Sequence, residues 1–130
     1  MRYFLSEKHP VCKLQNDDEV MTTPLNSCCL IVVRNVNDEV YAQHCGGSEL
    51  KNLAPSFFYN QAVEAIMVLG PESNYQKNQA HKFQLRPQIS SAILKYYAYN
   101  GSNLPMPVVK VESSGKLTLE NDDTYHLVNY

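Results

Sequence analysis

Two stretches of the sequence, residues 28–33 and 65–69, are apolar at every position. This pattern is typical of strands covered on both faces of a sheet, because a strand with one solvent-exposed face alternates between apolar and polar residues. Residues 35–38 hold the asparagine and aspartate that tight turns favour, and residues 39–44 then alternate. The pattern therefore predicts a hairpin whose first strand is central to its sheet.

Shorter runs predict further strands on either side of this hairpin. Residues 19–23 form a strand candidate that Pro24 ends, because proline has no amide N–H to give to a ladder. Residues 108–119 contain a second hairpin signal, two apolar runs around a Ser-Ser-Gly turn, and residues 125–128 predict a last strand.

Two segments favour helix. Residues 87–99 begin with proline, which suits a first helical position, and their apolar side chains recur at the helical spacing of three and four residues. Ser56 is a helix cap candidate for a short second helix that runs through residue 63, before the strand at 65–69. The expected fold class is therefore α+β, a mixed, largely antiparallel β-sheet or sandwich with one to three flanking helices.

Composition supports one globular domain. The 130 residues are 44% hydrophobic and 18% charged, which excludes a disordered chain and predicts a single domain over residues 1–130, with 1–18 as an irregular N-terminal arm. A net charge of -2 guarantees no large basic surface, so we expect no nucleic-acid partner.

The apolar runs indicate a soluble protein. Each is far shorter than the roughly 20 residues that cross a bilayer, so we expect no membrane partner. The first eight residues lack the apolar region of a secretory signal peptide. In such a chain the four cysteines are expected to be thiols rather than a disulfide framework.

The candidate chemistry lies around the predicted hairpin. Cys28 stands at the start of the buried strand, just after a tight turn, and His44 follows sixteen residues later at the end of the returning strand. A hairpin turn at 35–38 brings these two ends side by side, which offers a thiolate nucleophile and a proton shuttle. Thr22 could orient the other ring nitrogen through its hydroxyl or its carbonyl. By spacing alone, the more common interpretation is that Cys28 is an apolar core residue and His44 an incidental polar residue at the end of a strand.

A metal site is not expected. The sequence has no Cys-x-x-Cys and no pair of histidines at zinc-finger spacing, although Cys12, Cys45 and His81 add to the residues already named. It also has no phosphate-binding loop, nucleophilic-serine elbow or dinucleotide fingerprint.

Residues 22–28, with their Leu-Asn-Ser-Cys turn, and the downstream His44 resemble the signature of the cysteine-dependent glutamine deamidases. That superfamily includes the CheD chemoreceptor deamidase, the catalytic domain of cytotoxic necrotizing factor and Burkholderia lethal factor. Its cysteine closes a Leu-(Ser/Gly)-(Gly/Ser)-Cys turn, its histidine follows on the next strand, and several members have a threonine six residues before the cysteine. The resemblance covers residues 20–45. Asn26 departs from the turn pattern, and the Cys-Gly-Gly-Ser at 45–48 departs from CheD, which favours the toxin or effector branch.

The resemblance implies a protein glutamine deamidase with Cys28 as nucleophile, His44 as general base and acid, and Thr22 as orienting residue. Backbone amides of Ser27 and Cys29 would hold the oxyanion, and no cofactor is implied. Because side chains alternate along a strand, only one of Cys28 and Cys29 can face His44, and the motif favours Cys28.

The implied partner is a protein that exposes a glutamine, in the toxin branch a host protein. The implied enzyme is a monomer that reaches the host cell without an N-terminal signal peptide. Three alternatives stay open: a chemotaxis-type deamidase in the bacterial cytoplasm, a non-enzymatic binding or immunity protein with Cys28 in its core, and transglutamination through the same thioester.

Overall fold

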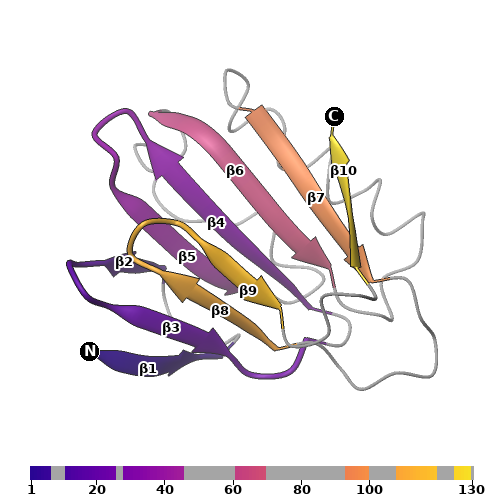
Figure 1. Cartoon of the computed structure of the whole chain (residues 1–130), viewed down its shortest axis with the longest axis horizontal. Helices are drawn as coiled ribbons and strands as arrows, with labels where there is room; N and C mark the ends of the chain where they lie inside the picture. The colour runs from indigo at the N-terminus through magenta and orange to yellow at the C-terminus, as the bar shows by residue number, and fades with distance from the viewer. Residues whose placement is uncertain are drawn as a thin grey trace.

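The computed structural model describes residues 1–6, 11–25, 28–45, 61–69, 93–99, 108–119 and 125–129, which form two β-sheets (Figure 1). The small sheet has the strand order β1-β3-β8-β9, and the large sheet has the order β10-β7-β6-β4-β5-β2. The strands of the small sheet are β1 (Arg2–Leu5), β3 (Glu19–Thr22), β8 (Val109–Glu112) and β9 (Leu117–Leu119). Those of the large sheet are β10 (Tyr125–Asn129), β7 (Ile93–Tyr99), β6 (Ala62–Leu69), β4 (Cys29–Asn35), β5 (Val40–Cys45) and β2 (Cys12–Leu14).

Most strand pairs are antiparallel. The exceptions are β1 with β3 and β6 with β7, which are parallel. The expected mixed, largely antiparallel sheet arrangement is therefore confirmed for the described residues.

The two sheets pack face to face, and the small sheet lies over β2, β4 and β5 in Figure 1. Apolar side chains from the inner faces of both sheets make one buried cluster, the inter-sheet core. Its members are Leu5, Leu14, Val20, Leu25, Leu30, Val32, Val40, Ala42, Val68, Val109 and Val111. Burial of these apolar side chains between the two sheets is the main contribution to the stability of such a sandwich.

The chain changes sheets repeatedly near its start. It runs from β1 in the small sheet to β2 in the large sheet, back to β3, and then across to β4. Leu25, on the last of these crossings, is fully buried in the inter-sheet core and anchors the crossing chain.

The β4–β5 hairpin has the predicted turn, fixed by the side chain of Asn35. Its Oδ1 accepts hydrogen bonds from the backbone N–H groups of Asn37 and Glu39, and its Nδ2 donates to the Glu39 carboxylate. Asp38 has a positive φ of 60°, a conformation that aspartate tolerates better than most residues. The predicted strands at 19–23, 28–33, 39–44, 65–69, 108–111, 116–119 and 125–128 are all confirmed within one to three residues at each end.

The predicted irregular arm at 1–18 is wrong, because it contains β1 and β2. Both are short edge strands without a clear alternation, and each is formed by pairing with one partner, β1 with β3 and β2 with β5. Strand formation that depends on a partner elsewhere in the chain leaves a weak local pattern.

The predicted helix at 87–99 is wrong for its second half, since residues 93–99 form β7. This segment has three tyrosines, a residue type that packs well in sheets, and it pairs with β6 on one side and β10 on the other. The first half of the predicted helix, residues 87–92, lies outside the described residues. The helix predicted through residue 63 conflicts with β6, which begins at Ala62, and its earlier part lies outside the described residues. Within the described ranges there is no helix, and so none that is long and apolar enough to cross a membrane.

Candidate active site at the open end of the hairpin

The ladder register divides the two cysteines and the histidine between opposite faces of the large sheet. Leu30 of β4 pairs with His44 of β5, and Cys29 pairs with Cys45. Because neighbouring residues point to opposite faces, His44 lies on the inner face with Leu30, whereas Cys29 and Cys45 share the outer face. Cys28 packs against the inter-sheet core, which puts it on the inner face with His44.

His44 reaches across from the large sheet to the small one. Its side chain is 2% exposed, and its Nδ1 lies 3.0 Å from the backbone carbonyl oxygen of Leu5 in β1. The Thr23 hydroxyl lies 3.4 Å from the same nitrogen. The Leu5 carbonyl also accepts the Thr23 backbone N–H at 3.2 Å, which joins the three residues in one network.

The Leu5 carbonyl determines which ring nitrogen carries the proton. A carbonyl oxygen only accepts hydrogen bonds, so Nδ1 must be the donor and Nε2 then carries the lone pair of the neutral ring. Nε2 is buried and has no hydrogen-bond partner among the residues that the structure describes. The imidazole is thus held in the tautomer and orientation that a general base needs, with its basic nitrogen available.

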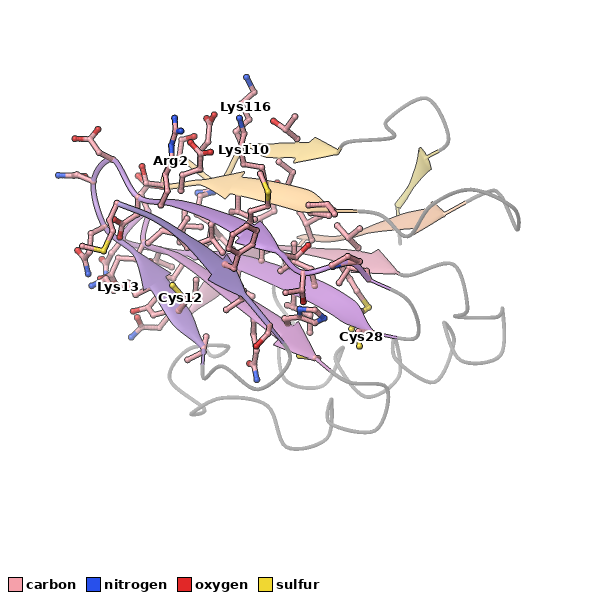
Figure 2. The ribbon with its side chains drawn as sticks, turned by 90° about the horizontal axis from the view of Figure 1, so that it is seen from below. Arg2, Cys12, Lys13, Cys28, Lys110 and Lys116 are labelled. Atoms are coloured by element: carbon pink, nitrogen blue, oxygen red, sulfur yellow. The ribbon has the colours of Figure 1, made fainter. Side chains whose placement is uncertain are left out.

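Cys28 is the accessible thiol of this region. It precedes β4 by one residue, is half-buried, and lies at one end of the sandwich, far from Cys12 (Figure 2). On the inner face it occupies the position diagonal to His44, where side chains of antiparallel strands come within reach of each other. Since Nε2 has no partner, the thiol makes no hydrogen bond to it here, and catalytic pairs often tighten only when substrate binds.

Cys29 is unsuited to be a nucleophile. Its side chain is completely buried, and a hydrogen bond with the Cys45 thiol, together with burial, raises the pKa of the Cys29 thiol well above its usual value. A thiol with a raised pKa is scarcely ionised at neutral pH and is therefore weakly reactive. The sequence motif favoured Cys28 over Cys29, and the role of Cys28 as nucleophile stays a prediction.

The threonine at the imidazole is Thr23 rather than Thr22. Thr22 is buried, but its hydroxyl accepts the backbone N–H of Val109 at 3.0 Å and so links β3 to β8. The sequence spacing thus indicated the position next to the one whose hydroxyl contacts His44. The Leu5 carbonyl was also missed, and no side-chain motif could have identified it, because the contact is made by backbone.

The proposed oxyanion donors are only partly described. Ser27 lies outside the described residues, and Cys29 lies inside the β4–β5 ladder, where its amide has a partner on β5. Donation by the Cys29 amide would require that ladder bond to open. The oxyanion role of both residues stays a prediction.

Two other features of the described ranges lie apart from this site. No group of three or more His, Cys, Asp or Glu side chains is placed to hold a metal ion there. A shallow pocket of about 240 Å³ lies on the outer face of β1 and β3, lined by Arg2, Phe4, Glu19 and Met21. The alternation of β1 and β3 turns this pocket away from the inter-sheet core, and therefore away from His44.

No protein-family model matches the chain, and no curated protein matches it.

Proposed function

We propose that this chain is a cysteine-dependent protein glutamine deamidase, with Cys28 as the nucleophile and His44 as the general base and acid. One observation carries the proposal: a buried histidine donates from Nδ1 to the Leu5 carbonyl and keeps an unpartnered Nε2 on the face that holds a half-buried cysteine. A structural histidine would be expected to satisfy both ring nitrogens, because an unpartnered buried polar atom destabilises the fold.

The first half of the reaction uses the imidazole as a base. Nε2 of His44 takes the proton of the Cys28 thiol, and the thiolate attacks the carboxamide carbon of a glutamine on the substrate protein. The resulting imidazolium keeps its Nδ1 hydrogen bond to the Leu5 carbonyl, so the ring stays in the same orientation through the step.

The second half uses the same imidazole as an acid and then again as a base. Nε2–H protonates the leaving nitrogen, so that ammonia departs and an acyl thioester forms on Cys28. His44 then deprotonates a water, whose oxygen replaces sulfur at the carbonyl carbon and leaves glutamate. Each turnover adds one negative charge to the target, which can change a binding surface through electrostatics alone.

The substrate of this proposed enzyme is a protein with an exposed glutamine. The departure from the CheD pattern at 45–48 favours a host protein and a secreted bacterial effector that acts as a monomer. A chemotaxis-type enzyme in the bacterial cytoplasm is the alternative within the same chemistry, and transglutamination follows if an amine replaces water at the thioester.

The test is the rate of alkylation of each cysteine by iodoacetamide, located by peptide mass mapping at neutral and mildly acidic pH. We expect rapid labelling of Cys28, slowed on the order of a hundredfold at the acidic pH by His44→Ala. Cys28→Ala should remove the rapid site, and Cys29→Ala should leave it unchanged. Incubation of the wild-type chain with cell lysate should then convert a glutamine to glutamate, whereas Cys28→Ala should not.

Slow labelling of Cys28 that is independent of His44 would contradict the proposal. The best account would then be a non-enzymatic binding or immunity protein in which Cys28 is a core residue, consistent with its packing against the inter-sheet core.

A further inference from the structure

We infer that Cys29 and Cys45 are a thiol pair that forms a reversible disulfide across the open end of the hairpin, on the face opposite Cys28 and His44. The proposed function makes no use of either residue. The two thiols face each other at the last pair of the β4–β5 ladder, both completely buried, and the Cys29 thiol is hydrogen-bonded to Cys45.

The Cα separation at this pair lies within the range that a disulfide needs. The Asn35 N–H donates to the Glu39 carbonyl at 3.0 Å, which makes residues 35 and 39 a hydrogen-bonded pair of the ladder. Hydrogen-bonded and non-hydrogen-bonded pairs alternate, and the register is continuous, so Cys29 and Cys45 also form a hydrogen-bonded pair. The Cα atoms of such pairs lie about 5.5 Å apart, within the range of about 4.4–6.8 Å for disulfides. Their Cβ atoms must move from about 5.5 Å to about 4 Å, a closure that requires local movement at this end of the ladder.

Oxidation needs access, which the position of the pair provides. Cys29 is the first residue of β4 and Cys45 is the last of β5, so the pair stands at the end of its ladder. Ladder ends open at low free-energy cost compared with unfolding of the whole sheet. The reaction is therefore expected to be slow, at a rate set by opening, and to need no global unfolding.

Glutathione disulfide is a sufficient oxidant. The Cys45 thiolate attacks one sulfur of glutathione disulfide and releases one glutathione thiolate, which leaves a mixed disulfide on Cys45. The mixed disulfide removes the Cys45 thiol from its hydrogen bond with Cys29, and opening of the ladder end exposes the Cys29 thiol to water, so that both causes of its raised pKa are relieved. The Cys29 thiolate then attacks the Cys45 sulfur, releases the second glutathione and closes the bond. The chain loses two hydrogen atoms, and the two glutathione molecules receive the two protons and two electrons.

Cys28 cannot take part without rearrangement, because it lies on the inner face. The disulfide therefore links β4 and β5 on the outer face of the large sheet, and Cys28, the proposed nucleophile, stays a thiol.

The experiment is a titration of the full chain with mixtures of reduced and oxidised glutathione, followed by acid quench, alkylation and peptide mapping. We expect a cross-linked peptide pair containing Cys29 and Cys45, full loss of that species in dithiothreitol, and a higher midpoint of thermal unfolding in the oxidised form. Cys29→Ser and Cys45→Ser should each abolish the cross-link and the rise in the midpoint, whereas the matched control Cys12→Ser should keep both.

Glutathione attached to Cys12 shows that the oxidant is in sufficient excess. If Cys29 and Cys45 do not cross-link under that condition, the inference is overturned. A disulfide from Cys28 to Cys29 or to Cys45 would overturn it as well. The cross-link is read by mass and does not depend on deamidation, so its absence would leave the proposed function untouched. Loss of His44-dependent labelling would likewise leave the disulfide untouched.

Discussion

The two ends of the β4–β5 hairpin differ in how fully their polar side chains are hydrogen-bonded. At the turn, the side chain of Asn35 makes three hydrogen bonds, and Glu39 adds an ion pair to Lys13 of β2. At the open end, Nε2 of His44 is buried with no partner in the described part of the chain, and the pKa of the Cys29 thiol is raised. The hydrogen bonds at the turn end stabilise the hairpin, and this stability offsets the cost of the unpaired Nε2 at the open end.

Asn35→Ala should have the largest effect on stability. It leaves the Asn37 and Glu39 N–H groups without their acceptor in a residue that is only 4% exposed, and we expect a loss of about 3 kcal/mol in the free energy of unfolding. Urea denaturation measures this loss. Cys28 alkylation in the folded protein should be unchanged, and a slowed alkylation would contradict the separation of the two ends.

Thr22→Val should destabilise the fold without affecting the site. The substitution keeps the shape of the side chain but leaves the buried Val109 N–H without its acceptor, at a cost of about 2 kcal/mol. Thermal unfolding reports the cost. If this variant slows Cys28 labelling as much as His44→Ala does, Thr22 rather than Thr23 is the orienting threonine.

Thr23→Val should do the reverse. Its hydroxyl lies 3.4 Å from Nδ1, a long hydrogen bond, so the free energy of unfolding should fall by less than about 1 kcal/mol. The rate of Cys28 alkylation should fall several-fold at mildly acidic pH, and Thr23→Ser, which keeps the hydroxyl, should restore it. Equal rates for the valine and serine variants would remove Thr23 from the site.

The smallest effect concerns pH at the turn end. Hydrogen bonds from Lys13 and then from Asn35 lower the pKa of the Glu39 carboxyl in the folded chain. Its contribution to stability is therefore fully present above the unfolded pKa of about 4.3 and is lost as pH falls through the lower folded value.

The free energy of unfolding should accordingly differ less between about pH 6 and about pH 3 in Glu39→Gln than in the wild-type chain. Urea denaturation at each pH measures it. Asp18→Asn is the matched comparison, because the pKa of the Asp18 carboxyl is also lowered, chiefly by the hydrogen bond from the Gln15 N–H. It should reduce the same stability difference while leaving the Glu39 contacts intact. An unchanged pH dependence in Glu39→Gln would show that its ion pair contributes nothing measurable.

The sequence predicted the parts of the fold that local pattern determines. Composition and periodicity predicted the apolar run at 28–33, the turn at 35–38 and the later hairpin at 108–119. The run and the turn together place His44 at the open end of the first hairpin. The β7 segment could not be predicted this way, because its spacing of apolar residues suits a helix and only pairing with β6 and β10 makes it a strand. At the site, strand alternation allowed only one of Cys28 and Cys29 to face His44, and the resemblance to the deamidase motif favoured Cys28. The Leu5 carbonyl could not be predicted, because it lies in a strand that the pattern missed.

That carbonyl has a consequence for genetic experiments. Every amino acid has a backbone carbonyl, so a scan of substitutions at position 5 would measure the packing of the leucine side chain and leave the acceptor for Nδ1 in place. Deletion of β1 would remove the acceptor, and the accompanying loss of four residues of sheet pairing would be taken for simple misfolding. The dependence of the imidazole on the first strand would thus escape both kinds of screen. Moving the backbone while the fold survives would reveal it, for example with a proline at position 23, which removes the Thr23 N–H that the same carbonyl accepts.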